Sequence, residues 1–196
     1  QAFCNKESWI DYCSVKKKDA LIKKGDKIRS AKNKADKESI KLPSKWLSEA
    51  QTEVNKYIRI RDVFEPCISC NKPREVIEAE QNWKVGGCWD AGHFQGRGAK
   101  GQLRFVLFNI HKQCKSCNGG SGNFSAKAAT VDANYKANLI KKIGIEKVEA
   151  LENNNSIDYR KKDIDYLKRV KKIFAKKARL YKTIRRVTPI IEDLAA

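Results

Sequence analysis

The sequence lacks any apolar segment close to the roughly 20 residues that a membrane-spanning helix requires, and it carries no lipidation motif. It has no secretory signal peptide, although it contains seven cysteines. Cysteines in such a chain argue against a disulfide framework and indicate a reducing compartment, so we expect the cytoplasm. Methionine is absent and the chain begins at Gln1, so we expect the natural start to be missing.

Acidic residues are scarce relative to basic ones. The chain has 42 Lys+Arg against 23 Asp+Glu, a formal net charge of +19. This excess is too large for solubility alone and favours a polyanionic partner. With membranes set aside, nucleic acid is the leading candidate, and a generic solvated basic surface is the alternative.

Charge and hydrophobic periodicity divide the chain into three regions. Residues 1–42 form a basic N-terminal arm, since residues 14–45 hold twelve Lys or Arg against four acids and have no continuous apolar stripe. We expect this arm to be flexible or marginally helical. Residues 43–125 hold a core-facing helix and a Gly-, Cys- and aromatic-rich core. Residues 126–196 form a basic helical C-terminal region.

Secondary structure follows from the same patterns. Apolar residues at three- and four-residue steps predict a helix from Pro43 to about Asp62, and strand-like stretches cover residues 88–94 and 103–108. Further helices are predicted over residues 130–143, 146–151 and from Ile157 or Tyr159 to Val187. The last has one apolar seam among many lysines. That seam is compatible with a symmetric dimer, or with a coiled coil or bundle that has no nucleic-acid role.

Four cysteines have the spacing of a zinc site. Cys67 and Cys70 form one Cys-x-x-Cys pair, and Cys114 and Cys117 form another after a loop of 43 residues. Soft thiolates select zinc over hard cations, and four of them close the coordination sphere, so we predict a structural zinc ion. Iron or a redox dithiol are the alternatives. Zinc binding would supply on the order of 10 kcal/mol toward folding.

The other cysteines give weaker signals. Cys4 and Cys13 are spaced as half of a second zinc site, whose other ligands would have to precede Gln1. Free thiols in a frayed terminus explain them equally well. Cys88 has no partner at ligand spacing and is expected to be a buried small residue.

Between the cysteine pairs lies a set of residues suited to phosphodiester hydrolysis. His93 follows Gly92 at the end of a predicted strand and is the candidate general base, although a lone histidine is often structural. Asp90 and Asn118 offer hard oxygen ligands for Mg²⁺ or Mn²⁺. Asn109, expected on a loop after the second strand, could bond to the backbone near His93 and orient it. Turn or cap roles are the alternative for each asparagine.

The order of these motifs resembles the lambda-type NinG (Rap) recombination endonucleases, phage members of the HNH or ββα-metal superfamily. The matching segments are residues 46–62, Trp89-Asp90-Ala91-Gly92-His93-Phe94, Leu103-Arg104-Phe105, Asn109-Ile110-His111-Lys112-Gln113-Cys114, Cys117-Asn118, Ser121-Gly122-Asn123 and residues 143–152. The resemblance implies an endonuclease that cuts Holliday junctions and D-loops during phage recombination, in the cytoplasm of the bacterial host and alongside other phage recombination proteins.

The resemblance also implies site roles. His93 matches the general base, Asn109 the asparagine that positions the active-site loop, and Asn118 the last metal-binding position. His111 matches a histidine that touches phosphate or metal. One departure is Gly92, because the superfamily usually has Asp or His immediately before the base. Asp90 is therefore our candidate ligand, since positions 90 and 92 share one face of a strand.

We therefore predict an α+β fold with a zinc-stabilised, HNH-like ββα-metal core flanked by basic helices. The predicted function is metal-dependent hydrolysis of branched double-stranded DNA, with His93 as base. Two alternatives remain from the sequence. One is a zinc-knuckle DNA-binding protein without catalysis, and the other is an HNH nuclease acting on linear duplex DNA.

Overall fold

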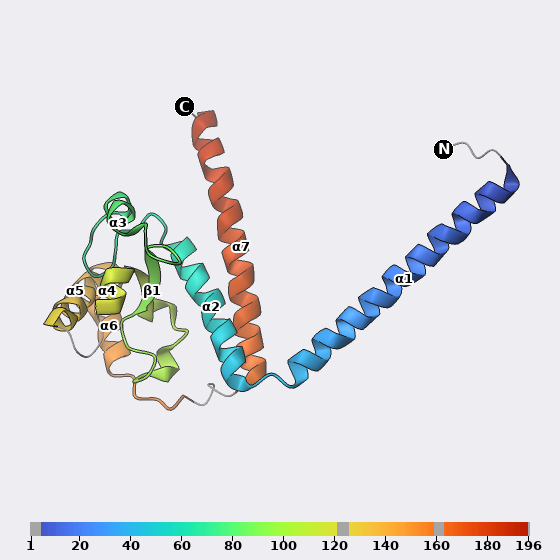
Figure 1. Cartoon of the computed structure of the whole chain (residues 1–196). Helices are drawn as coiled ribbons and strands as arrows, with labels where there is room; N and C mark the ends of the chain where they lie inside the picture. The colour runs from blue at the N-terminus through green and yellow to red at the C-terminus, as the bar shows by residue number, and fades with distance from the viewer. Residues whose placement is uncertain (1–4, 121–125, 159–162, 196) are drawn as a thin grey trace. The chain divides into compact units, whose positions relative to one another are not determined.

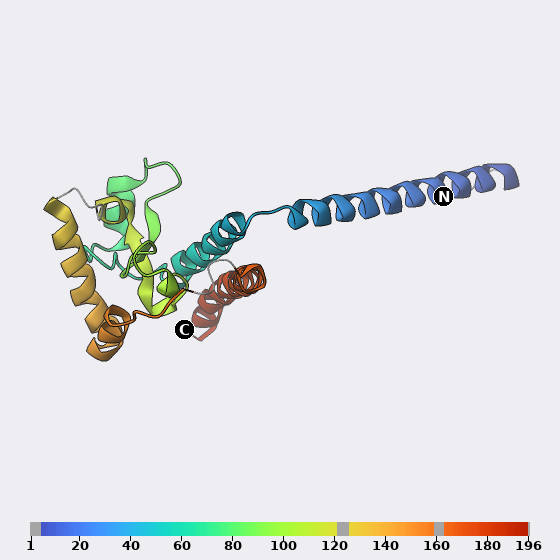
Figure 2. The ribbon, with the colours of Figure 1, turned by 90° about the horizontal axis from the view of Figure 1, so that it is seen from below.

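The chain consists of two units, residues 1–42 and 43–196, which are described separately. The computed structural model describes residues 5–120, 126–158 and 163–195. Figures 1 and 2 show the ribbon in two views. None of the helices within the described residues is both long and apolar enough to cross a membrane.

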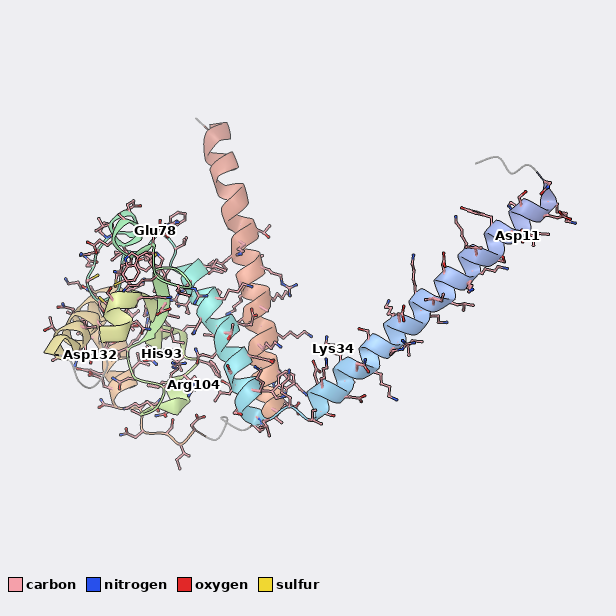
Figure 3. The ribbon with its side chains drawn as sticks, viewed as in Figure 1. Asp11, Lys34, Glu78, His93, Arg104 and Asp132 are labelled. Atoms are coloured by element: carbon pink, nitrogen blue, oxygen red, sulfur yellow. The ribbon has the colours of Figure 1, made fainter. Side chains whose placement is uncertain are left out.

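The first unit is a helix, α1 (Lys6–Ser39), none of whose residues is buried. It begins at Asn5, whose side chain accepts a hydrogen bond from the backbone N–H of Ser8, as a helix cap does. Lysine and alanine favour helix, and no proline interrupts the segment. The basic arm expected to be flexible or marginally helical is thus a continuous helix, whose side chains stand clear around it in Figure 3.

A pair of helices forms one side of the second unit. Helix α2 (Pro43–Arg61) and helix α7 (Ile164–Ala195) lie side by side in Figures 1 and 2, and the bounds of α2 confirm the predicted helix. Helix α7 begins at Ile164, later than Ile157, and runs past Val187. Its apolar seam packs on α2 of the same chain, through the buried residues Trp46, Ala50, Val54, Tyr57, Ile58, Leu167, Val170, Phe174 and Ala178.

An antiparallel hairpin lies at the centre of the second unit. Strand β1 (Trp89–His93) pairs with strand β2 (Ile110–Cys114), with Trp89 opposite Cys114 and His93 opposite Ile110. Figures 1 and 2 show the hairpin between the α2–α7 pair and helices α5 (Ala126–Ile143) and α6 (Ile145–Glu152). The predicted first strand is therefore confirmed, as are the two helices predicted over residues 130–143 and 146–151.

The strand predicted over residues 103–108 is wrong. Two short 3-10 helices, Gly101–Leu103 and Leu107–Asn109, occupy this stretch instead. Its apolar side chains go to two different places: Leu103 and Val106 pack with α5 and α6, whereas Phe105 and Leu107 pack with α2 and α7. In a strand, Leu103, Phe105 and Leu107 would share one face, because side chains alternate with a period of two. The turns of the 3-10 helices instead direct Leu103 to one cluster and Phe105 and Leu107 to the other.

Two short helices complete the second unit and were not predicted. Helix α3 (Arg74–Gln81) follows the first cysteine pair, and helix α4 (Lys115–Gly120) directly follows β2 and carries Cys117. The order β1, β2, α4 brings the second cysteine pair back against the first. The fold is thus α+β, mainly helical with a small two-stranded sheet.

Candidate active site and metal centre

The four predicted zinc ligands come together. The Sγ atoms of Cys67, Cys70, Cys114 and Cys117 all lie within 4.8 Å of one another. Four thiolates at 2.3 Å from a tetrahedral zinc ion would be about 3.8 Å apart, so the cluster is compatible with a structural zinc. No other such group of His, Cys, Asp and Glu side chains occurs among the described residues.

Local backbone geometry builds this cluster from two turns. Asn71 has a positive φ of 55° and its N–H donates to the carbonyl of Cys67 at 2.9 Å, which closes the first knuckle. The N–H of Cys114 donates to Cys67 Sγ at 3.3 Å. This bond links the second knuckle, at the end of β2, to the first.

The sulfurs are crowded enough to affect their ionisation. Hydrogen bonds from the Cys114 and Cys117 thiols lower the pKa of Cys67 to about 3. Hydrogen bonds to Cys114 and Cys67, together with burial, raise the pKa of Cys117 far above its ordinary value, because a thiol that donates such bonds is stabilised in its protonated form. A cation among the sulfurs would stabilise several thiolates together, as in zinc-thiolate sites.

Two other described cysteines, Cys13 and Cys88, are not members of this four-sulfur group, although Cys88 packs against it. Cys88 is buried, and its carbonyl accepts from the N–H of Lys115 at 2.9 Å. Cys13 lies on α1 with intermediate exposure, and Cys4 lies outside the described residues. The second zinc site suggested by Cys4 and Cys13 therefore stays a prediction.

His93 ends β1 and has a fixed ring orientation. Its Nε2 lies 3.1 Å from the carbonyl oxygen of Arg104. A carbonyl only accepts, so Nε2 carries the proton and Nδ1 keeps its lone pair. Burial, with the nearby charges of Arg97 and Arg104, lowers the pKa of His93 to about 4. The ring is thus neutral near pH 7 and able to accept a proton.

Two arginines lie beside His93. Arg104 Nη2 donates to the carbonyl of Arg97 at 3.4 Å, and both cations act on the His93 ring. Arg104 Nε is buried and has no hydrogen-bond partner among the described residues. Figure 3 shows His93 and Arg104 on the same side of the second unit. Guanidinium groups in this arrangement suit a phosphate, and sequence reasoning had given neither arginine a role.

Asn109 is tied to the loop that follows His93. Its Oδ1 accepts from the N–H of Gln95 at 2.7 Å, and its Nδ2 donates to the carbonyls of Gln95 and Leu103 at 3.1 and 3.2 Å. The side chain is fully buried. The residue lies just before β2, rather than after a second strand, and bonds to the backbone near His93.

Asp90 and Asn118 are in direct contact. Asn118 Nδ2 donates to Asp90 Oδ2 at 3.0 Å, joining α4 to β1. The amide nitrogen faces the carboxylate, so a hard cation would be bound here by Asp90 and by the amide oxygen Oδ1 of Asn118. His93 lies three residues farther along β1, on the alternate side of the strand.

A third oxygen explains the departure at Gly92. A Cβ built on Gly92 would lie 2.0 Å from Gln113 Oε1, so the amide of Gln113 occupies the space of a side chain there. Gln113 is opposite Asp90 in the hairpin, and its Nε2 donates to Ser69 Oγ at 2.7 Å. It was missed because the pairing of the strands was not predicted.

His111 is enclosed by protein groups. Its Nε2 lies 3.2 Å from the carbonyl of Phe108, and its Nδ1 lies 3.2 Å from Arg61 Nη2 and 3.7 Å from Asp62 Oδ2. Burial alone would raise the pKa of Asp62. Hydrogen bonds from Arg61 and His111 outweigh burial and hold this pKa well below its usual range. His111 thus belongs to a buried polar network on the other face of the hairpin from His93.

Comparison with known proteins agrees with the motif order. The family described as "Bacteriophage Lambda NinG protein" matches residues 1–184. Protein ninG of Escherichia phage 933W is 40% identical over 126 residues, 64% of this chain and 53% of that protein. Protein ninG of Escherichia phage lambda is likewise 40% identical over 126 residues, covering 64% and 52%.

A third relative, protein ninG of Salmonella phage P22, is 39% identical over 125 residues, 63% of this chain and 52% of that protein. The chain therefore spans about half the length of these relatives. No solved structure matches it. The family match extends over most of the chain, including the cysteine cluster and the hairpin that carries His93. The chain belongs to the bacteriophage lambda NinG protein family.

Proposed function

We propose that the protein is a metal-dependent endonuclease of the HNH, or ββα-metal, type that cuts branched DNA. The element order supports this: His93 ends β1, β2 follows antiparallel to it, and α4 returns Asn118 to β1. A zinc ion in the cysteine cluster would hold the two ends of this arrangement together. The net charge of +19 suits a nucleic-acid substrate.

One observation carries the proposal: His93 is a neutral, oriented imidazole beside two arginines. The Arg104 carbonyl fixes the tautomer, and burial keeps the ring unprotonated near pH 7. Nδ1 then takes a proton from the attacking water. Arg97 and Arg104 bind the scissile phosphate and stabilise the charge that develops on it. A purely structural histidine needs no such flanking pair of guanidinium groups.

Asp90, Asn118 and Gln113 would hold the hard cation. Asp90 and Asn118 are in contact, and Gln113 brings its amide to the position that Gly92 leaves free. When bound, Mg²⁺ or Mn²⁺ would withdraw charge from the phosphate and the leaving 3′ oxygen. Asn109 fixes the loop after His93 by bonding to Gln95 and Leu103. Expected products are 5′-phosphate and 3′-hydroxyl ends.

For His111 the proposal departs from the sequence expectation. Both ring nitrogens face protein atoms, and the residue is 3% exposed. We assign it a positioning role that links α2 to β2 through Arg61 and Asp62, rather than a contact with substrate.

Resolution of a junction needs two matched nicks, so we propose that two copies act together. The buried α7 residues Leu167, Val170, Phe174 and Ala178 pack on α2 of the same chain, so we propose that the copies contact each other through another surface. Branched double-stranded DNA and other phage recombination proteins are the proposed partners. The candidate from another class, a DNA-binding protein without catalysis, accounts for the charge and the cysteines but leaves the His93 arrangement without a role.

The chain has two histidines, so each is a control for the other. His93→Ala should lower the cleavage rate of a four-way junction in Mg²⁺ by about 10²- to 10⁴-fold, the contribution of a general base. Its affinity for the junction should be unchanged. His111→Gln should lower the free energy of unfolding, because it disturbs the Arg61–Asp62 network, while the folded fraction still cuts.

Two results would contradict the assignment. If His93→Ala cuts as fast as the unmodified protein, the base lies elsewhere. If neither protein cuts a junction or a matched linear duplex in Mg²⁺ or Mn²⁺, the DNA-binding alternative is favoured. Cutting both DNAs equally would favour the linear-duplex nuclease.

A further inference from the structure

The loop between α3 and β1 exposes two large apolar side chains that neither the metal centre nor the His93 site uses. In this loop, residues 82–87, Trp83 is 79% exposed and Val85 is 95% exposed, and Lys84 Nζ lies 5.7 Å from the centre of the indole ring. Single exposed apolar residues are common on protein surfaces. A tryptophan and a β-branched residue within three positions, both turned outward, are a stronger indication of a contact surface.

This loop has a defined shape. Trp83 Nε1 donates to the carbonyl of Glu80 at 3.1 Å, which orients the indole ring. The N–H of Lys84 donates to the carbonyl of Gln81 at 3.0 Å, and that of Gly87 donates to the carbonyl of Lys84 at 2.9 Å. Gly86 and Gly87 have positive φ angles of 78° and 84°, which other residues rarely adopt.

The loop is also anchored to the helix of the second cysteine knuckle. Lys84 Nζ donates to Ser116 Oγ at 2.6 Å, and Lys115 Nζ donates to the carbonyl of Val85. These bonds turn Trp83 and Val85 away from the protein. Because the loop is already ordered, a ligand that contacts it has little conformational entropy to overcome.

Basic groups surround the loop. Its base borders a cavity of about 320 Å³ whose lining includes Arg59, Arg74, Lys112 and the Trp89 ring. Lys112 is buried, with Nζ 4.0 Å from the centre of that ring and donating to the carbonyl of Val63 at 3.0 Å, so Arg59 and Arg74 are the more exposed cations of this lining. Glu78, the carboxylate of this lining, pairs with Arg74 at 2.6 Å. An apolar tip flanked by cations favours a polyanion with exposed aromatic faces over an apolar protein surface.

We propose that the Trp83 loop, residues 82–87, is a wedge that stacks on the base pair exposed at a DNA branch point. Inside a continuous duplex, insertion of the indole would first have to unstack two base pairs. At a branch no unstacking is required, because the base pair next to the branch point already lacks a stacking neighbour on one side. Stacking of Trp83 is therefore favourable at a branch and unfavourable in linear DNA, and Arg59 and Lys84 bind the adjoining phosphates.

This inference rests on the proposed function, since it names how branched DNA would be selected. The loop precedes Trp89 at one end of β1, and His93 is at the other end. Four strand steps of about 3.3 Å separate those two residues by about 13 Å, or roughly four base-pair rises of 3.4 Å. The nick is thus expected a few base pairs away from the branch.

The test compares binding of a four-way junction and a matched linear duplex, with Ca²⁺ replacing Mg²⁺ to keep the DNA intact. Trp83→Ala combined with Val85→Ala should weaken junction binding by about 5- to 150-fold, the usual loss for an aromatic that stacks on a base. Linear-duplex binding should be unchanged. Trp83→Tyr, which keeps a stacking ring, should restore most of the affinity. Trp9→Ala on α1 is the matched control, since that tryptophan is also exposed, at 54%.

A cross-linking measurement locates the contact. A 5-iodouracil placed at the branch should photo-cross-link to Trp83 of the full chain, and one placed within the linear duplex should not. The wedge is overturned if the double substitution weakens both DNAs equally, or neither, or if the cross-link survives Trp83→Ala. Both experiments measure binding and not cutting. The wedge proposal can therefore be contradicted while His93-dependent cutting is still observed, and it can be supported even if the protein never cuts DNA.

Discussion

At the scale of single residues, the contact between Gly92 and the side chain of Gln113 is a feature that the sequence does not reveal. Read along the chain, Gly92 is a missing ligand beside the candidate base. In the hairpin, Gln113 Oε1 takes the space that a Cβ on Gly92 would need. The space beside Gly92 is thus filled from the other strand, which becomes visible only when the register is known.

The crowding at Gly92 gives a direct prediction. Gly92→Ala should lower the free energy of unfolding by about 1–3 kcal/mol, as overpacking does, because Gln113 is buried and bonded to Ser69. Urea denaturation measures this. Gly96→Ala, where a Cβ has nothing within 4 Å, is the control and should change stability by less than about 0.5 kcal/mol. Equal effects at both positions would contradict the described contact.

The environment of His93 predicts the pH dependence of cutting. Burial lowers its pKa to about 4, so the base stays neutral well below the ordinary histidine pKa of about 6.5. The acidic limb of kcat/KM against pH should therefore lie below pH 6. Because the unfolded chain binds the proton first, His93 also makes stability fall as pH drops from 6.5 through 4. A limb centred at 6.5 would contradict the burial.

At the scale of secondary-structure elements, hydrophobic periodicity predicted the elements whose apolar residues repeat regularly along the chain. Helix α2 and strand β1 were found because their apolar residues repeat at helical or strand spacing and face one core. The second strand was misplaced because residues 103–108 look strand-like, yet their side chains separate into two clusters. Strand β2 contains His111, Lys112 and Gln113, which are polar and nevertheless buried. Such burial depends on partners such as Asp62 and Ser69, distant in sequence.

The cysteine cluster should determine whether the hairpin folds. Cys67→Ser should abolish stoichiometric zinc binding and lower the thermal unfolding temperature, since a structural zinc supplies on the order of 10 kcal/mol. Metal content and a thermal melt of the full chain measure both effects. Cys88→Ala, a buried cysteine outside the cluster, should retain zinc. Loss of zinc from the Cys88 variant, or its retention by the Cys67 variant, would contradict the assignment.

At the scale of the whole molecule, the positive charge is shared by both units. Helix α1 has no buried residue, so its role has to be argued from charge. If it contacts DNA, each of its lysines that neutralises a phosphate adds about 0.9 to the slope of log affinity against log salt. Substitution of Lys23, Lys24 and Lys27 by glutamine should then reduce the slope by up to about 2.7. The cleavage rate at saturating DNA should not change.

An unchanged salt slope would remove α1 from the DNA-binding surface. A lower cleavage rate at saturating DNA would mean that α1 does more than bind phosphates. Composition alone predicted a nucleic-acid partner and a basic arm. Which basic residues are proposed to contact DNA depends on how the chain folds: on the His93 side these are Arg97 and Arg104, to which the sequence analysis gave no role.

The central claim is that one chain holds two chemically different metal sites, with soft sulfur ligands in one and hard oxygen ligands in the other. Anomalous X-ray diffraction from crystals grown with zinc and soaked in Mn²⁺ tests this most directly. We expect a zinc peak among Cys67, Cys70, Cys114 and Cys117, and a separate manganese peak bounded by oxygens of Asp90 and Asn118. Manganese absent from that position, or found only among the sulfurs, would contradict the claim.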